Sequence, residues 1–207
     1  MKIICIGRNY VEHIRELDNT DQLPSVPQFF MKPDTALLRN NDPFYVPSFS
    51  KQLDYETELV VRIGRVGRSV EERFARRFYA EVGLGIDFTA RDLQREAIAK
   101  GLPWEICKAF DKSAAISPVF VPLAELGGDA QRLHFEMRLN GELRQSGDTA
   151  KMIFGVDRVI SYVSQFVTFR MGDLLFTGTP VGVGPVHPGD HLEATLEGRT
   201  LLDFDIK

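Results

Sequence analysis

The sequence predicts an α+β protein that is mostly β, with a few helices at its periphery. Two observations predict this class: strand-like segments outnumber helical ones, and the two kinds do not alternate regularly along the chain. A regular alternation would be needed for a doubly wound parallel sheet. The 207 residues contain no internal repeat and no clear boundary, so we expect a single domain over residues 1–207.

Composition excludes several classes of protein. Hydrophobic residues make up 43% and charged residues 26%, which is enough apolar material for a folded chain. The net charge of −4 gives no basic surface for nucleic acid, and no apolar run approaches the roughly 20 residues that cross a membrane. Cys5 and Cys107 form no CxxC motif, so we expect neither a disulfide scaffold nor a structural zinc site. The apolar stretch before Gly7 is too short for a secretory signal, which predicts a cytoplasmic protein.

The N-terminal part of the chain combines strands with one short helix. Residues 1–7 are rich in isoleucine and predict a strand, and residues 10–19 have helical spacing with Ile14 and Leu17 on one side. Prolines recur between residues 22 and 47 and exclude a regular helix there. Residues 53–63 alternate between apolar and charged side chains, which is the clearest strand pattern in the sequence.

The middle of the chain predicts two helices around a strand. Residues 69–82 are charged with helical spacing, and residues 82–87 predict a strand. Thr89 and Asp92 have the spacing of a capping box for a helix that runs to Lys100 and stops at Gly101.

The second half predicts mostly strands. Asn140 and Gly141 form the strongest two-residue hairpin signal, between strand-like segments in residues 134–146. An amphipathic helix is expected over residues 156–168, and strands are expected over residues 173–178 and 191–207.

Three carboxylates suggest a metal site. Glu56 and Glu58 lie two residues apart on a predicted strand, so their side chains leave the same face, roughly 7 Å apart along the backbone. The alternative for this pair alone is an ordinary solvated face of a sheet. Asp87 ends another predicted strand, whose Gly83 and Gly85 share its face and leave room above the sheet. Oxygen ligands without clustered histidine or cysteine suit Mg²⁺ or Mn²⁺ rather than zinc.

Other polar signals admit two interpretations each. His13 and Glu16 are neighbours on one helix face, which suits a general base oriented by a carboxylate but also an exposed pair. Lys108 is either a substrate-binding cation or a surface lysine. Residues 177–190 resemble a phosphate loop, but their prolines exclude the helix that such a loop requires. His187 and His191 are separated by Pro188 and Gly189, which argues against a helical zinc site.

The chain resembles the fumarylacetoacetate hydrolase family. The resemblance is carried, in family order and over nearly the whole chain, by the segments GRNYVEHIRELDN, FFMKPDTALL, LDYETELVVRIG, LGIDFTARDLQ, GLPWEICKAFD, NGELRQSGDTAKMIF and DLLFTGTPVGVGPV. The combination of E-x-E, D-x-T-A-R-D, K-x-F-D and T-G-T-P is highly specific. The chain is most similar to the short, single-domain branch that includes acylpyruvate hydrolases and oxaloacetate decarboxylases, without the extra N-terminal domain of fumarylacetoacetate hydrolase itself.

The resemblance implies a mixed β-sandwich roll that assembles as a homodimer. It implies a Mg²⁺ or Mn²⁺ site at Glu56, Glu58 and Asp87, for which Ca²⁺ can substitute in crystals. It also implies a lid helix at about residues 10–18, which carries His13 and Glu16. These two residues and Lys108 would be catalytic, and the residues that would surround the substrate are Arg8, Lys32, Arg91, Gln94 and Thr179.

The implied function is metal-dependent chemistry on a small 2-oxo acid. One form is hydrolysis of the C–C bond of acylpyruvates such as fumarylpyruvate or acetylpyruvate, with His13 activating a water. A second is decarboxylation of oxaloacetate, and both would pass through a pyruvate enolate on the metal. The alternatives are an isomerase, tautomerase or decarboxylase of the 2-hydroxyhepta-2,4-diene-1,7-dioate type, and a non-catalytic metabolite-binding protein on the same scaffold.

Overall fold

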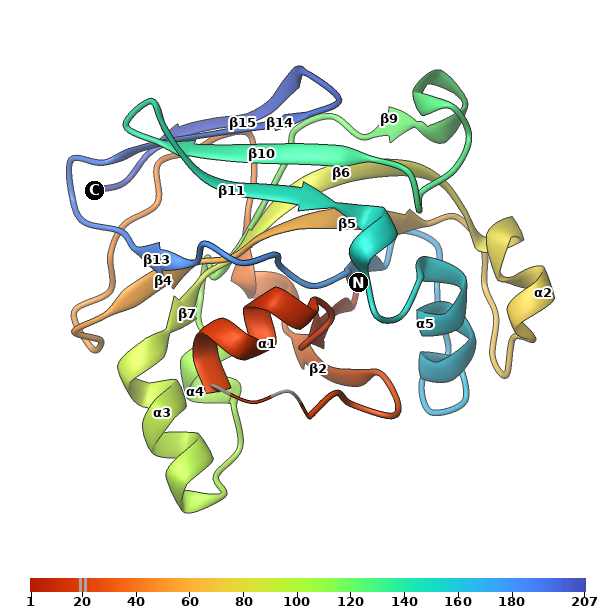
Figure 1. The fold of residues 1–207 in the computed structure, drawn as a ribbon, viewed down its shortest axis with the longest axis horizontal. Helices are drawn as coiled ribbons and strands as arrows, with labels where there is room; N and C mark the ends of the chain where they lie inside the picture. The colour runs from red at the N-terminus through yellow and green to blue at the C-terminus, as the bar shows by residue number, and fades with distance from the viewer. Residues whose placement is uncertain (19, 21) are drawn as a thin grey trace.

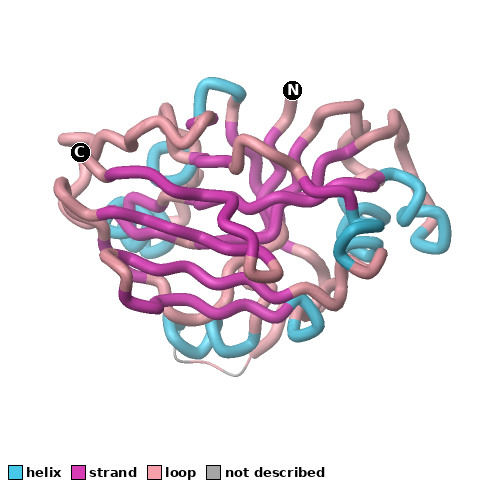
Figure 2. Tube along the Cα trace, turned by 90° about the horizontal axis from the view of Figure 1, so that it is seen from above, coloured by secondary structure: helices cyan, strands magenta, loops and turns pink. Residues whose placement is uncertain are grey.

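The chain is built mainly from β-strands, as the sequence predicts. The computed structural model describes residues 1–18, 20 and 22–207, and the strands of this part form sheets of eight, four and three strands (Figure 1). Figure 2 shows the same strands from above, with helices at the edges of the molecule. The expected mostly β, α+β class is therefore confirmed.

The largest sheet is mixed and curled. Its strand order is β2-β1-β12-β5-β6-β8-β3, with β9 also beside β6. The β1–β12 and β3–β8 pairs are parallel, whereas the other pairs are antiparallel. One buried cluster joins residues near both edges of the sheet, including Ile3, Leu37 and Val60, so the sheet curls around this cluster. The strands are β1 (Ile3–Gly7), β2 (Gln28–Lys32), β3 (Leu37–Leu38), β5 (Thr57–Ile63), β6 (Tyr79–Asp87), β8 (Ala114–Ile116), β9 (Val121–Pro122) and β12 (Leu174–Phe176).

The four-stranded sheet covers the other face of β5 and β6 (Figure 1). Its order is β11-β10-β14-β15, and its inner residues share a second buried cluster with Leu59 and Leu84. The turn between β10 and β11 contains Asn140 and Gly141, both at positive φ (55° and 80°), which confirms the predicted hairpin. The strands are β10 (His134–Leu139), β11 (Glu142–Asp148), β14 (His191–Leu196) and β15 (Arg199–Asp205).

The smallest sheet divides the expected strand at residues 53–63 into two. Its strands are β4 (Leu53–Tyr55), β7 (Thr89–Ala90) and β13 (Gly184–Pro185), in the order β13-β4-β7. The chain leaves this sheet at Glu56 and enters the large sheet at Thr57. Before the break Leu53 pairs with Ala90 of β7, and after it Thr57 pairs with Ile86 of β6. The break lies at one of the carboxylates of the predicted metal site.

The helices are short and lie at the periphery. They are α1 (Val11–Asp18), α2 (Glu72–Ala75), α3 (Arg91–Lys100), α4 (Glu105–Lys108) and α5 (Val156–Val163), with 3₁₀ turns η1 (Asp34–Ala36), η2 (Arg76–Phe78), η3 (Leu123–Leu126) and η4 (Thr149–Lys151). In Figure 1, α1, α3 and α4 lie on the side away from the four-stranded sheet. Asn19, the last residue of the first expected helix, lies outside the described residues. None of the helices in the described residues has the length and apolar character that a membrane span requires.

The helix expected over residues 69–82 is mostly wrong. Only α2 and the 3₁₀ turn η2 form there, and β6 already begins at Tyr79. Glu81 pairs with Arg62 of β5 and Val82 with Val121 of β9, so strand pairing overrides the local helical pattern. The helix expected over residues 156–168 is also shorter and ends at Val163.

The predicted capping box of α3 does not form. Ala90 precedes the helix and provides no side-chain cap, while Thr89 Oγ1 donates to the Asp87 carbonyl. Asp92 instead accepts hydrogen bonds from the Ser50 hydroxyl and the Lys51 backbone N–H, so it ties the helix to the segment before β4. The helix stops at Gly101, as predicted. Gly101 has a φ of 64°, in the left-handed region.

Candidate active site

The register between β5 and β6 brings the three carboxylates together. Glu58 lies opposite Gly85, and the Asp87 N–H donates to the Glu56 carbonyl at 2.8 Å, so Glu56, Glu58 and Asp87 leave one face of the pair. Each offers a carboxylate oxygen within 4.8 Å of the others. All three are buried, Glu58 to 1% exposure, so the interpretation as a solvated face is wrong.

The glycines beside Asp87 have a different role from the expected one. A Cβ on Gly83 would lie 2.4 Å from Ser117 Oγ, and one on Gly85 would lie 2.5 Å from the Phe176 ring. The space above these glycines is thus filled by core side chains and is not open to a ligand. The glycines let the sheet curl tightly beneath the site.

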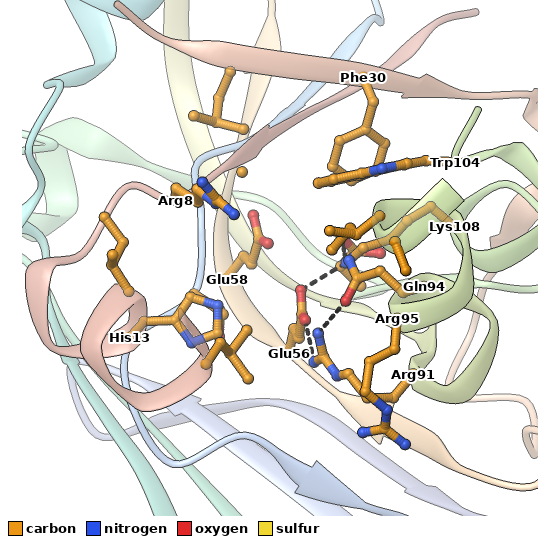
Figure 3. A pocket seen from close by; sticks show the side chains of 18 residues that line it. Arg8, His13, Phe30, Glu56, Glu58, Arg91, Gln94, Arg95, Trp104 and Lys108 are labelled. Carbon is orange, nitrogen blue, oxygen red and sulfur yellow. Dashed lines mark hydrogen bonds and ion pairs between the residues drawn. The ribbon is translucent and has the colours of Figure 1, made fainter. Parts of the chain in front are cut away.

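Basic side chains surround two of the carboxylates. Lys108 Nζ donates to Glu56 Oε2 at 2.7 Å, to Asp87 Oδ2 at 2.8 Å and to Thr89 Oγ1 at 2.6 Å. Arg91 donates from Nη2 to Glu56 Oε1, and Figure 3 shows both cations converging on Glu56. Lys108 is 2% exposed, so it is not a surface lysine.

Arg91 and Lys32 are held in place by further partners. Arg91 Nε donates to Asp54 Oδ2 at 2.7 Å, and Arg91 also binds Gln94 Oε1. Lys32 Nζ lies 2.7 Å from Asp87 Oδ1 and donates to the Ser113 carbonyl and hydroxyl. Each ion pair is buried, so breaking one would leave an uncompensated charge at a high cost.

Glu58 is the carboxylate that lacks a cation. Its Oε2 accepts a hydrogen bond from the Gly178 N–H at 2.6 Å, but no lysine or arginine of the described chain forms an ion pair with it. Burial, and then the negative charges of Asp87 and Glu56, raise the pKa of Glu58 well above its usual value. A divalent cation beside Glu58 would remove this cost, and three carboxylate oxygens are hard ligands that Mg²⁺ and Mn²⁺ prefer. The residues present therefore fit such a cation.

The electrostatics of Glu56 differ from those of Glu58. Burial alone would raise the pKa of Glu56, but the charges of Lys108 and Arg91 lower it well below its usual value. Burial would likewise lower the pKa of Lys108, whereas Asp87 and Glu56 raise it. Glu56 and Lys108 therefore form a charged pair, and Glu56 is ready to serve as a metal ligand without losing a proton.

A cavity of about 310 Å³ opens over the carboxylates. Of the site residues that the sequence predicts, those that line it are Arg8, His13, Glu56, Glu58, Asp87, Arg91, Gln94, Lys108 and Thr179 (Figure 3). Lys32 lies behind Asp87 and does not line the cavity, so it supports the Asp87 carboxylate from below. Phe30 and Trp104, whose rings are 5.8 Å apart, form an apolar part of the wall.

The predicted His13–Glu16 pair forms at the edge of this cavity. His13 Nδ1 lies 3.3 Å from Glu16 Oε2, and His13 is buried (6% exposed). Glu16 Oε1 accepts a hydrogen bond from the Gly182 N–H, so Glu16 holds His13 from outside the cavity. Leu17, expected on the same inner side as Ile14, is 43% exposed and lies at the mouth.

Arg8 enters the cavity from a strained backbone. It follows β1 directly and has a φ of 58°, in the region that non-glycine residues rarely adopt. In Figure 3 its guanidinium points toward Glu58. Strain of this kind persists at sites where a side chain must be aimed at a ligand, which is consistent with the predicted substrate-binding role.

Several site residues were not anticipated from the sequence. Gln145 of β11 accepts from the Thr57 N–H at 2.9 Å and donates to Thr179 Oγ1 and the Pro180 carbonyl. It thereby fixes the backbone between Glu56 and Glu58 to the loop after β12. The signal was its inward position in the predicted hairpin, where a polar side chain needs buried partners. Asp54, Ser113, Arg95 and Trp104 were also missed as site residues.

Comparison with known proteins gives consistent matches over the whole chain. Residues 2–206 match the family described as fumarylacetoacetate (FAA) hydrolase C-terminal. The chain is 41% identical to the mitochondrial oxaloacetate tautomerase FAHD1 of Mus musculus, over 99% of this chain and 91% of that protein. It is 42% identical to the oxaloacetate tautomerase YcgM of Escherichia coli, over 97% and 90%. The crystal structure of fumarylpyruvate hydrolase from Pseudomonas aeruginosa in complex with Mn²⁺ and pyruvate superposes with a TM-score of 0.92 at 36% identity, covering 100% and 89% of the two chains.

Proposed function

The chain belongs to the fumarylacetoacetate hydrolase family, and from this we propose that it is a divalent-metal-dependent enzyme of 2-oxo acids that moves protons between keto and enol forms of oxaloacetate. The metal would be Mg²⁺ or Mn²⁺, held by Glu56, Glu58 and Asp87. The observation that carries the proposal is the buried triad in the same cavity as His13, in which Glu58 has no ion-pair partner among the described residues.

The sequence relatives favour this reaction over hydrolysis as the main activity. The mouse and Escherichia coli relatives are both named oxaloacetate tautomerases. Tautomerisation was the alternative that the sequence left open beside hydrolysis and decarboxylation. The names of these relatives support tautomerisation for this chain.

A divalent cation in this site would act as a Lewis acid and stabilise negative charge on the oxygen of the 2-oxo group. The other steps belong to the side chains. Glu16 accepts from His13 Nδ1–H and so leaves Nε2 as the base on the cavity side. His13 Nε2 takes a proton from C3 of the substrate, and a proton is returned to the carbonyl oxygen to give the enol.

Arg8, Gln94 and Thr179 line the cavity and are placed to bind the carboxylate of the substrate. Lys108 bridges Glu56 and Asp87 and holds the two carboxylates close together. In this proposal Lys108 positions the metal ligands, and Lys32 does the same for Asp87 from behind.

Hydrolysis of acylpyruvates is the second candidate. The structural similarity to a fumarylpyruvate hydrolase that contains Mn²⁺ and pyruvate favours it. The same His13, oriented by Glu16, would then take a proton from a water that attacks the C4 carbonyl of a 2,4-dioxo acid. The C3–C4 bond breaks and C3 is protonated, which releases pyruvate and the carboxylic acid.

The proposal also includes the cytoplasm as location and a homodimer as assembly, both of which the family resemblance and the sequence suggest. They are tested by fractionation and by light scattering of the purified protein.

A substrate screen with the metal-stripped protein tests the function. We expect no enzymatic acceleration of oxaloacetate enol–keto exchange in chelator, and restored turnover with Mg²⁺ or Mn²⁺. Parallel assays with acetylpyruvate and fumarylpyruvate decide between the two candidates. Inactivity on all three compounds with either metal would contradict the proposal and favour a binding protein.

A further inference from the structure

Arg95 is a basic residue at the mouth of the cavity that the site described above does not use. It lies on α3, four residues after Arg91, and both side chains line the cavity. Residues four apart on a helix are neighbours, with Cβ atoms about 6 Å apart. Figure 3 shows Arg91 directed at Glu56, whereas the Arg95 guanidinium is turned away from Glu56. Arg95 thus offers a second positive charge at the cavity, separate from that of Arg91.

The charge of Arg95 is not neutralised by the protein. Its hydrogen-bond partner is the neutral side chain of Gln52, at 2.7 Å from Nη2, and no carboxylate of the described residues forms an ion pair with it. Arg91, by contrast, is paired with Asp54 and Glu56. The Gln52–Arg95 bond is exposed, so exchanging it for a carboxylate on a ligand costs little.

The cations of the buried centre are already engaged with its carboxylates. Arg91 pairs with Asp54 and Glu56, Lys108 pairs with Glu56 and Asp87, and Lys32 pairs with Asp87. In the proposed function the head of a 2-oxo acid lies beside this centre and Arg8. A second carboxylate farther along a ligand would then meet Arg95, which has no carboxylate partner among the described residues.

The wall between the centre and Arg95 suits a carbon chain. Leu17 of α1 and Ile98 of α3 line the mouth, and both are about half exposed. Trp104 and Phe30 line the cavity nearer Lys108. A ligand with an anionic head, a short apolar chain and an anionic end would meet complementary groups along its length.

We propose that Arg95 is a specificity-determining residue that binds the distal carboxylate of extended 2-oxo diacids, so that the site selects them over 2-oxo monoacids of equal length. The proposal rests on the proposed function, because that function places the 2-oxo acid head at the metal. In an extended 2-oxo diacid of seven carbons, five carbons separate the two carboxylates, so the second carboxylate reaches away from the metal ligands along the cavity that Arg95 lines. In oxaloacetate the second carboxylate is next to the reacting carbons and too close to the head for Arg95.

A matched pair of ligands that cannot undergo C–C cleavage tests the proposal. 2-Oxoheptanedioate and 2-oxoheptanoate have the same chain and differ only in the terminal carboxylate, and neither has the 4-oxo group that C–C cleavage needs. Their dissociation constants are measured by calorimetry on the full chain in Mg²⁺, for the wild type, Arg95→Gln and Arg95→Lys. Lys100→Gln is the control, because it removes one positive charge from the same helix outside the cavity.

We expect the wild type and Lys100→Gln to bind the diacid about tenfold more tightly than the monoacid, the effect of one charge-assisted hydrogen bond. Arg95→Gln should bind both with about equal affinity, and Arg95→Lys should retain part of the preference. An undiminished preference in Arg95→Gln, or none in the wild type, would overturn the proposal. The binding test needs no turnover. If the protein prefers the diacid but is inactive on oxaloacetate and acylpyruvates, the proposed function is refuted and the role of Arg95 in binding is not.

Discussion

Glu16 of α1 accepts a hydrogen bond from the Gly182 N–H at 3.0 Å, while its other oxygen lies 3.3 Å from His13 Nδ1. One carboxylate thus joins the N-terminal helix to the loop that follows β12 and orients the ring of the proposed base. Thr179, which lines the cavity, lies on the same loop. The position of His13 over the cavity therefore depends on a contact between segments far apart in the sequence.

Replacement of His13 should remove proton transfer without removing the metal. We expect His13→Ala to lower oxaloacetate tautomerisation and acylpyruvate cleavage by about 10²- to 10⁴-fold, the usual contribution of a general base. Decarboxylation of oxaloacetate needs no attacking water and should be spared. Mn²⁺ affinity, followed by electron paramagnetic resonance, is the control. Unchanged tautomerisation and cleavage would reject the role of His13.

Two substitutions of Glu16 separate its two contacts. Glu16→Gln keeps an oxygen that accepts from Gly182 but loses the charge beside His13, whereas Glu16→Ala loses both. We expect kcat for tautomerisation to fall in both variants, and the unfolding midpoint to fall more in Glu16→Ala. Equal activity of Glu16→Gln and the wild type would show that the carboxylate charge is not needed.

Metal binding should stabilise the folded protein through Glu58. A ligand that binds only the folded state adds about 2.7 kcal/mol to the unfolding free energy at a concentration 100 times its dissociation constant. We expect Mg²⁺ or Mn²⁺ to raise the melting temperature of the wild type, with no such rise in Glu58→Gln. A similar rise in both proteins would place the stabilising metal elsewhere.

Lys108 should stabilise the fold in the absence of metal. Lys108→Met leaves Glu56 and Asp87 without the cation between them, and we expect a loss of about 3–5 kcal/mol in the free energy of unfolding. Lys100→Met is the matched control, because Lys100 forms an exposed pair with Glu96 that contributes under about 1 kcal/mol. Chemical denaturation in chelator measures both. A loss in Lys108→Met no larger than in the control would contradict the buried-pair account.

Gln145 should couple the two sheets to the site. Gln145→Leu removes the hydrogen bonds that Gln145 forms with the Thr57 N–H and the Thr179 hydroxyl. We expect a loss of about 2–3 kcal/mol in the free energy of unfolding. The KM for oxaloacetate should rise as well, because Thr179 lines the cavity. Gln165→Leu, at an exposed glutamine, is the control. If Gln145→Leu is destabilised but has the same KM as the wild type, Gln145 has only a structural role.

Local patterns in the sequence predicted most of the strands and the clustering of the three carboxylates. Glu56, Glu58 and Asp87 were found because strand periodicity fixes which side chains share a face, and the register of β5 and β6 then brings them together. The hairpin at Asn140 was found because its turn needs two residues at positive φ. The strand periodicity and the turn depend on neighbours in the sequence, whereas the register between β5 and β6 is a contact between distant segments.

Features set by distant contacts were missed. The segment before β6 has a helical pattern, but its pairing with β5 and β9 extends the strand to Tyr79. Asp92 fits a capping box, yet the nearby Ser50 and Lys51 offer it better partners. The roles of Gln145 and Arg95 likewise depend on which loops and helices meet at the cavity. No local pattern specifies such contacts.

A Mn²⁺ titration of the metal-stripped wild type tests the central claim most directly, with free Mn²⁺ followed by electron paramagnetic resonance and oxaloacetate tautomerisation measured in the same samples. The account predicts that activity rises in proportion to the occupancy of one tight site, and that Glu58→Gln lacks both the tight site and the activity. Full tautomerase activity of the stripped wild type in chelator, or a tight site that persists in Glu58→Gln, would contradict it.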